Sequence, residues 1–314
     1  MTRPRFPATG QIRCYDGAGR EIPCAGSGQD GEWRRGVAAR EPRFDIDGGL
    51  VRDRLTGLLW TRDANLAGFP LTWAEALAQV AGMNRAHDHG RADWRLPNRR
   101  ELRSLLCYQS TRPALPAGHP FTNVFPGWYW SATSAAISPA HAWYVHLQGG
   151  RMFYGGKDQS FLLWPVCAAG TGLLAVTGQR DCHDQRGGVV PCAGSGQDGE
   201  TARGRPWPAP RFQYAGEGLF DRLTGLVWRR DADLLHGTVT WAGALAAVRG
   251  LNAGEGGAPG AWRLPNINEL ESLVDCSRHS PALRPLDFWS TASPLSMRRT
   301  TSIAGPETWA PCSR

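Results

Sequence analysis

Aromatic and basic side chains gather between residues 128 and 154, and such residue types can recognise sugars and their acidic groups. An arginine such as Arg151 can donate two parallel hydrogen bonds to a sulfate or carboxylate. Tyrosine rings can stack on sugar rings, and two tryptophans of this stretch have no clear counterpart in the second half of the chain. The predicted ligand-binding residues are Tyr144, His146, Arg151, Tyr154, Trp128 and Trp143, and the alternative is that they are ordinary residues on the surface of strands.

Eight cysteines form the second group of side chains with possible chemistry, and each half of the chain carries four. No C-x-x-C motif occurs, so a zinc ribbon or a thioredoxin site lacks its basic motif. Pairing into disulfides requires an oxidising compartment. Two pairs are expected to clip hairpins and two to close long loops. The expected disulfides are Cys14–Cys24, Cys107–Cys167, Cys182–Cys192 and Cys276–Cys312.

Metal and catalytic chemistry have weaker candidates. His87 and His89 form an H-D-H sequence in a polar loop, but the equivalent loop of the second half, GEGGAPG, contains no histidine. Asp30, Glu32 and Asp53 lie in turns, where carboxylates commonly bind backbone amides. No G-x-S-x-G, P-loop or Rossmann fingerprint is present. We therefore expect no catalytic residue, no metal site and no cofactor.

The elements that would position these residues follow from local patterns. Alternation in AWYVHL places Tyr144 and His146 on one face of a strand, and further strands are expected through the stretch from 128 to 167. A helix is predicted over 72–85, with a capping box of Thr72 and Glu75. A shorter helix should begin after Asn98 and again after Asn266. The predicted fold class is α+β with a mostly antiparallel sheet.

The chain repeats itself. PCAGSGQDGE, DRLTGL and WRLPN each occur twice, 168 residues apart. We define copy 1 as residues 9–168 and copy 2 as residues 177–314, with a short link between them. Beyond WRLPN the register is expected to drift, with Cys107 matching Cys276, and copy 2 is shortened near its C-terminal end.

Charge and hydropathy restrict the partners. The net charge is +7, and Lys157 is the single lysine among 35 basic residues. This charge indicates an anionic partner, or it reflects an arginine-rich proteome. The chain contains no run of five basic residues, so nucleic acid is not the expected partner. No apolar run is long enough to cross a membrane. The start, MTRPRFPATG, has no apolar signal region, which conflicts with the cysteine arrangement. Either the start is truncated or wrongly assigned, or export is unconventional, or the cysteines are reduced in the cytosol, and the cysteine arrangement favours the first.

Together the motifs TGQ…C…PC, QDGE, D-x-x-TGL-x-W, TW-x-EA, WRLPN-x-x-EL and YWS resemble the bacterial Lcl C-terminal domain family, over nearly the whole chain. The resemblance implies two divergent C-type lectin-like domains, related to the formylglycine-generating-enzyme fold. It also implies export and adhesion through sulfated glycosaminoglycans. The EPN, QPD and WND motifs of calcium-dependent lectins are absent, and the closely spaced cysteines lie in the N-terminal hairpins, so neither calcium-dependent sugar binding nor oxidase activity is implied.

We therefore expect an exported or cell-surface module without catalysis, in the periplasm, secreted or on the cell surface. Its expected partners are sulfated or other anionic glycans, or an envelope protein. The alternatives are a structural pair of envelope domains without a ligand and, less favoured, an enzyme on the related fold.

Overall fold

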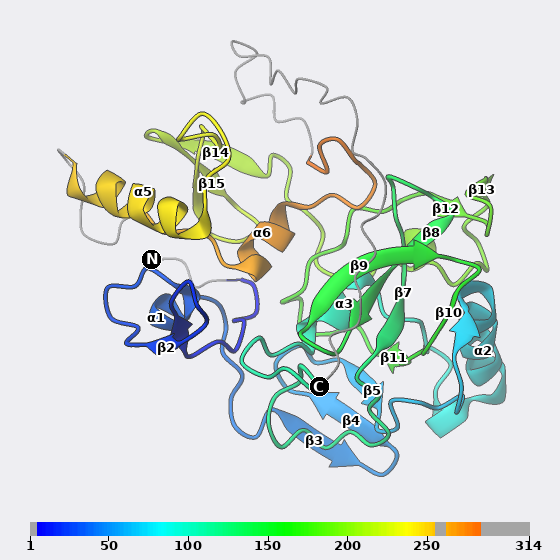
Figure 1. The fold of residues 1–314 in the computed structure, drawn as a ribbon. Coiled ribbons are helices and arrows are strands. Elements are labelled where there is room, and N and C mark those ends of the chain that lie inside the picture. The colour runs from blue at the N-terminus through cyan, green and yellow to red at the C-terminus, as the bar shows by residue number, and fades with distance from the viewer. Residues whose placement is uncertain (1–4, 255–261, 284–314) are drawn as a thin grey trace, which may run out of the picture. The chain divides into compact units, whose positions relative to one another are not determined.

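The chain alternates between short strands and short helices (Figure 1). The structure is a computed structural model, and it describes residues 5–254 and 262–283. Within these residues the predicted α+β class is confirmed, because helices occur with several small antiparallel sheets, none of which closes on itself. A single compact unit contains all of the described residues.

Each copy begins with a disulfide-closed hairpin and one turn of helix. We call residues 9–37 hairpin 1 and residues 177–205 hairpin 2. The expected disulfides Cys14–Cys24 and Cys182–Cys192 are present. Hairpin 1 contains β1 (Cys14–Tyr15), β2 (Glu21–Ile22) and α1 (Asp30–Trp33), and hairpin 2 contains β12 (Cys182–His183), β13 (Val189–Val190) and α4 (Asp198–Thr201).

A small antiparallel sheet follows each hairpin, in the order β11-β5-β4-β3 in copy 1 and β14-β15-β16 in copy 2. The DRLTGL turn joins its strands as expected. Asp53 accepts hydrogen bonds from the hydroxyl of Thr56 and from Nε and Nη2 of Arg43. Its carboxylate therefore stabilises the turn rather than a cation. The strands are β3 (Phe44–Asp47), β4 (Leu50–Asp53), β5 (Leu59–Thr61), β11 (Val166–Cys167), β14 (Phe212–Ala215), β15 (Gly218–Asp221) and β16 (Val227–Arg229).

The longest helix of copy 1 is α2 (Trp73–Ala86), and its counterpart in copy 2 is α5 (Trp241–Ala253). The predicted capping box is confirmed in α2, where Thr72 and Glu75 bond reciprocally. In α5, Thr240 still caps the helix, but Gly243 cannot return a side-chain bond. A short 3-10 helix, η1 (Asp88–Gly90), follows α2.

The WRLPN motifs introduce the two short helices α3 (Arg99–Ser104) and α6 (Ile267–Leu273). Both begin at the predicted asparagine and carry a complete capping box. The motif arginine forms a buried ion pair with the box glutamate, Arg95 with Glu101 and Arg263 with Glu269. The motif thus stabilises the start of the helix that follows it, because one glutamate accepts hydrogen bonds from both the backbone amide of the capping asparagine and the motif arginine.

The C-terminal part of copy 1 forms the three-stranded sheet β7-β8-β9, with β9 at the edge. Two large core clusters lie beneath the sheets, and Trp60, Trp130 and Trp164 are fully buried in them. Trp60, Trp73, Trp94 and Trp130 are buried in copy 1, whereas Trp241, the counterpart of Trp73, is 54% exposed in copy 2. The remaining strands are β6 (Leu71–Thr72), β7 (Trp128–Ser134), β8 (His141–His146), β9 (Arg151–Gly156) and β10 (Ser160–Phe161).

The expected Cys107–Cys167 disulfide is wrong, because both side chains are free thiols. Cys107 lies against Gly10 of hairpin 1, whereas Cys167 pairs through β11 with β5 and belongs to the second core cluster. Burial raises the pKa of the Cys167 thiol to about 11, so it stays protonated at neutral pH. Cys276 has no disulfide partner among the described residues, and Cys312 lies outside them.

The expected register drift after WRLPN is also wrong as far as residue 283. The amide of Cys107 donates to Ala114 and that of Asp275 donates to Ala282, which preserves the offset of 168. Tyr108 and Cys276 likewise both donate to the threonine that opens their hairpin, Thr9 or Thr177. Cys107 therefore corresponds to Asp275 and not to Cys276. The expected shortening of copy 2 falls mainly on residues outside the described ones.

Each hairpin contacts the other copy as well as its own. Asn98 of copy 1 donates to the carbonyl of Arg203 at 3.1 Å, and Asn266 of copy 2 donates to the carbonyl of Arg35 at 3.2 Å. Because both pairs are related by the same offset of 168, the contacts are reciprocal, as in an isologous dimer interface. Each hairpin thus lies against the capping asparagine of the other copy.

Candidate functional site

The predicted ligand-binding residues are brought together by the register of β7, β8 and β9. Residues directly opposite one another share a face of an antiparallel sheet. Trp128, His146 and Arg151 are partners across the three strands and form one row. The next row on this face contains Trp130, Tyr144 and Phe153. We define the aromatic face by six residues, Trp128, Tyr144, His146, Arg151, Phe153 and Phe161.

Ring contacts hold the aromatic face together. Trp128 stacks on Phe161 at a centroid distance of 5.8 Å and meets His146 edge-on at 4.8 Å. Tyr144 contacts Phe161 at 5.0 Å and Phe153 at 6.5 Å. Trp128 and Phe153 remain 43% and 56% exposed. The face therefore offers rigid rings to the solvent, a geometry suited to stacking on an amphipathic ring.

Arg151 supplies the charge at the edge of this face. Its side chain is exposed and uses its Nε to donate to the carbonyl of Gln148. Its charge acts on two neighbours. Burial lowers the pKa of His146, and the positive charge of Arg151 lowers it further. Burial raises the pKa of Tyr144, and Arg151 opposes this shift. At neutral pH, Arg151 is therefore the cation of the face, and His146 is a neutral ring that accepts from the amide of Gln148 through Nδ1.

Trp143 and Tyr154 are partners on the opposite side of the sheet from the two rows. Trp143 lies under the guanidinium of Arg99, 3.9 Å from its ring centroid, which ties it to α3. Tyr154 still reaches the edge of the aromatic face, because its ring stacks on that of Phe153 at 4.7 Å. Of the six predicted residues, four thus share the face, Tyr154 borders it, and Trp143 serves the packing of α3.

The sequence analysis did not identify Phe153 and Phe161. Phe153 is opposite Tyr144 in the pairing of β9 with β8, two residues after Arg151, so alternation along β9 places both on this face. Phe161 lies on β10, which pairs with β6 near the start of α2. Only the tertiary arrangement brings it over Trp128, and no local pattern in the sequence indicates that contact.

His87 and His89 take structural positions beyond α2. His87 ends the helix in a left-handed conformation, and the His89 ring lies 6.1 Å from that of Trp94. Within residues 5–254 and 262–283, no three histidine, cysteine or carboxylate side chains converge in a way that could hold a metal.

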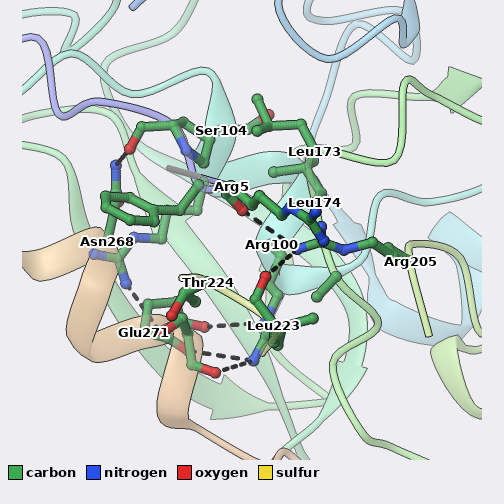
Figure 2. A pocket seen from close by; sticks show the side chains of 15 residues that line it. Arg5, Arg100, Ser104, Leu173, Leu174, Arg205, Leu223, Thr224, Asn268 and Glu271 are labelled. Carbon is green, nitrogen blue, oxygen red and sulfur yellow. Dashed lines mark hydrogen bonds and ion pairs between the residues drawn. The ribbon is translucent and has the colours of Figure 1, made fainter. Parts of the chain in front are cut away.

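A small arginine-rich cavity lies where the two copies meet (Figure 2). Its volume is about 50 Å³, enough for a few water molecules and too small for a sugar ring. Arg205 donates to the carbonyl of Leu223 at 2.6 Å, and Arg100 donates to carbonyls at the end of α6, including that of Glu271 (Figure 2). The bond of Arg100 joins the two copies, whereas that of Arg205 lies within copy 2, so these arginines are engaged in holding the fold together.

A larger groove of about 860 Å³ lies between α2 and hairpin 2. Its lining includes Trp73 and Leu77 of α2 and His183 of hairpin 2, together with Lys157. The equivalent stretch of copy 2 has no lysine, since Lys157 is the only one in the chain.

Comparison with known families confirms the resemblance of the motifs. The model of the Lcl C-terminal domain matches residues 49–167 and again residues 218–310, which is more than half of the chain. The chain belongs to the Lcl C-terminal domain family. Both matches begin after the hairpins, so hairpins 1 and 2 lie outside the matched residues. No curated protein matches the chain. No helix of the described residues is long and apolar enough to cross a membrane.

Proposed function

We propose that this Lcl C-terminal domain protein is an exported or cell-surface binding module that recognises anionic glycans through the aromatic face of copy 1. The observation that carries the proposal is the row of Trp128, His146 and Arg151 beside exposed rings on one face. Stacking would select a sugar ring, and Arg151 would select its sulfate or carboxylate. Family membership and the two disulfides support a role outside the cytoplasm.

The experiment is a binding titration of the oxidised protein with heparin, a neutral glycan and a salt series. We expect saturable binding to heparin that weakens as salt screens Arg151, and little binding to the neutral glycan. Arg151→Ala should weaken heparin binding about tenfold, the loss expected for a hydrogen bond to a charged group. Trp128→Ala should weaken binding to the same extent at high salt, where stacking persists.

Arg52→Ala is the matched control, because Arg52 is exposed on β4 and its removal changes the net charge equally. A general effect of positive charge would weaken binding equally in both arginine variants. That result, or no binding of heparin by the wild-type protein, would remove the aromatic face from the role proposed here.

A further inference from the structure

The groove between α2 and hairpin 2 has the dimensions of a small-molecule site. Its volume of about 860 Å³ lies within the range of ligand pockets. One wall is the side of α2 that carries Trp73, Leu77 and Val80, and the other is hairpin 2. The charged and titratable residues that line it, besides Lys157, are Asp93, Arg95, His183, Asp184, Glu200 and Arg203.

Lys157 lies in this groove with only 1% of its surface exposed. Its Nζ donates to the backbone carbonyls of His183 at 3.0 Å and Asp184 at 3.2 Å. It also lies 4.1 Å from the ring centroid of Trp73. Among the described residues no carboxylate forms an ion pair with it, and the carboxylate of Asp184 accepts instead from the amides of Arg186 and Gly188.

Burial favours the uncharged form of this amine, whereas the carbonyls and the face of Trp73 also suit an ammonium group. Two carbonyl acceptors satisfy the two hydrogens of a neutral amine and leave its lone pair free. Burial lowers the pKa of Lys157 to about 7, and Asp184 opposes this shift only in part. Close by, His183 has an Nδ1 atom without a hydrogen-bond partner among the described residues, and burial and Lys157 lower its pKa.

We propose that Lys157 is a covalent binding site for small aldehydes with an apolar body, which the groove admits and Lys157 captures as an imine. The amine nitrogen attacks the carbonyl carbon, forming a carbon–nitrogen bond. The carbonyl oxygen then leaves as water with the two amine protons, so the step needs no oxidant or reductant. The α2 wall holds the apolar body, and neutral His183 is placed to accept a proton during the addition.

The test uses benzaldehyde with cyanoborohydride, which reduces the imine and makes the adduct permanent. Because the chain has one lysine, the only other primary amine is the N-terminus, and peptide mapping separates the two. We expect the wild-type protein to be labelled at Lys157, with a rate that reaches half its maximum near pH 7. An ordinary lysine, with a pKa of about 10.4, would reach it only in strong alkali.

Labelling confined to the N-terminus at pH 7.4, or labelling of Lys157 only above about pH 9, would overturn the proposal. This decision needs no variant, so it does not depend on whether a substitution at Lys157 folds. Lys157→Arg should remove the internal adduct and leave the N-terminal one.

A second pair of variants tests the groove itself. Ala78 of α2 lines the groove, and Ala78→Phe should narrow it and slow labelling of Lys157 about tenfold. The adjacent Gln79 is exposed and is not among the lining residues, so Gln79→Phe is the control. Equal labelling rates in these two variants would show that aldehydes do not reach Lys157 through the groove.

Discussion

At the scale of single residues, the aspartates of the repeated QDGE turns form hydrogen bonds between the copies. Asp198 is 1% exposed and accepts hydrogen bonds from the hydroxyls of Thr133 at 2.7 Å and Thr177 at 2.6 Å. Its counterpart Asp30 accepts from Thr9 and from Asn266. Thr133 and Asn266 each belong to the copy opposite the aspartate they bind, so these two aspartates join each hairpin to the other copy.

The protonation of Asp198 should make stability depend on pH. Burial raises the pKa of Asp198 to about 6, from an ordinary value of 3.8. Between these values the folded protein holds a proton that the unfolded chain has lost, so this group makes the fold less stable as pH rises from 4 to 6. Asp198→Asn should remove this slope, which amounts to at most about 3 kcal/mol.

Urea denaturation of the wild type and the variant at pH 4, 5, 6 and 7 measures the effect. Asp181→Asn is the control, because Asp181 is exposed in the same hairpin. A difference between wild type and Asp198→Asn that stays constant across these pH values would contradict a raised pKa at Asp198.

At the scale of elements, the paired helices α2 and α5 isolate the effect of a capping box. Thr72 and Glu75 complete the box of α2, whereas Gly243 occupies the glutamate position in α5. A Cβ added at Gly243 would meet the Oγ1 of Thr240 at 3.3 Å, so a side chain there needs only a small adjustment. The helix of copy 2 therefore keeps one half of the motif.

Gly243→Glu should stabilise α5 by about 1–2 kcal/mol, adding the capping bond to the gain of replacing a helical glycine. Gly243→Ala separates the two contributions, because it should deliver only the propensity gain of about 1 kcal/mol. Thermal and urea denaturation of both variants give the comparison. Equal stability of the glutamate and alanine variants would show that no box forms in α5.

Helix caps and other local elements of this kind could be predicted from the sequence. The caps of α2, α3 and α6 depend on residues three positions apart, and the hairpin disulfides join cysteines ten positions apart. The aromatic face was accessible in part, because alternation identifies the side chains on one side of β8. Phe161 was not, since it reaches the face from another strand pair.

At the scale of the whole molecule, sequence reasoning failed where contacts cross between the copies. A repeat suggests two self-contained domains, yet each hairpin contacts the capping asparagine of the other copy. The cysteine pairing failed within copy 1. Cys107 lies against Gly10 of hairpin 1, whereas Cys167 pairs through β11 with β5, and the spacing of the cysteines does not indicate these separate positions.

At the interface between the copies, one residue contacts the residue at the equivalent position of the other copy. Arg103 and Glu271 are 168 residues apart, and they form an ion pair at 2.9 Å. Identical residues at this position would repel or leave two buried charges unpaired, so the difference between the copies gives the interface complementary charges. The same Oε2 of Glu271 also accepts from Arg99 at 2.7 Å, and the arginines involved are buried.

Removing this single carboxylate charge should therefore destabilise both copies together. Glu271→Gln leaves Arg99 and Arg103 buried without a counterion, a change that costs about 3–5 kcal/mol. Because each hairpin contacts the other copy, we expect the wild type to unfold in one transition and the variant to do so at a lower urea concentration. Circular dichroism and tryptophan fluorescence should give the same unfolding curve. Glu217→Gln is the control, because Glu217 is exposed, and it should leave the urea midpoint unchanged. Two separate transitions in the wild type, or a variant in which only one part of the chain unfolds early, would show that the copies are independent despite their reciprocal contacts.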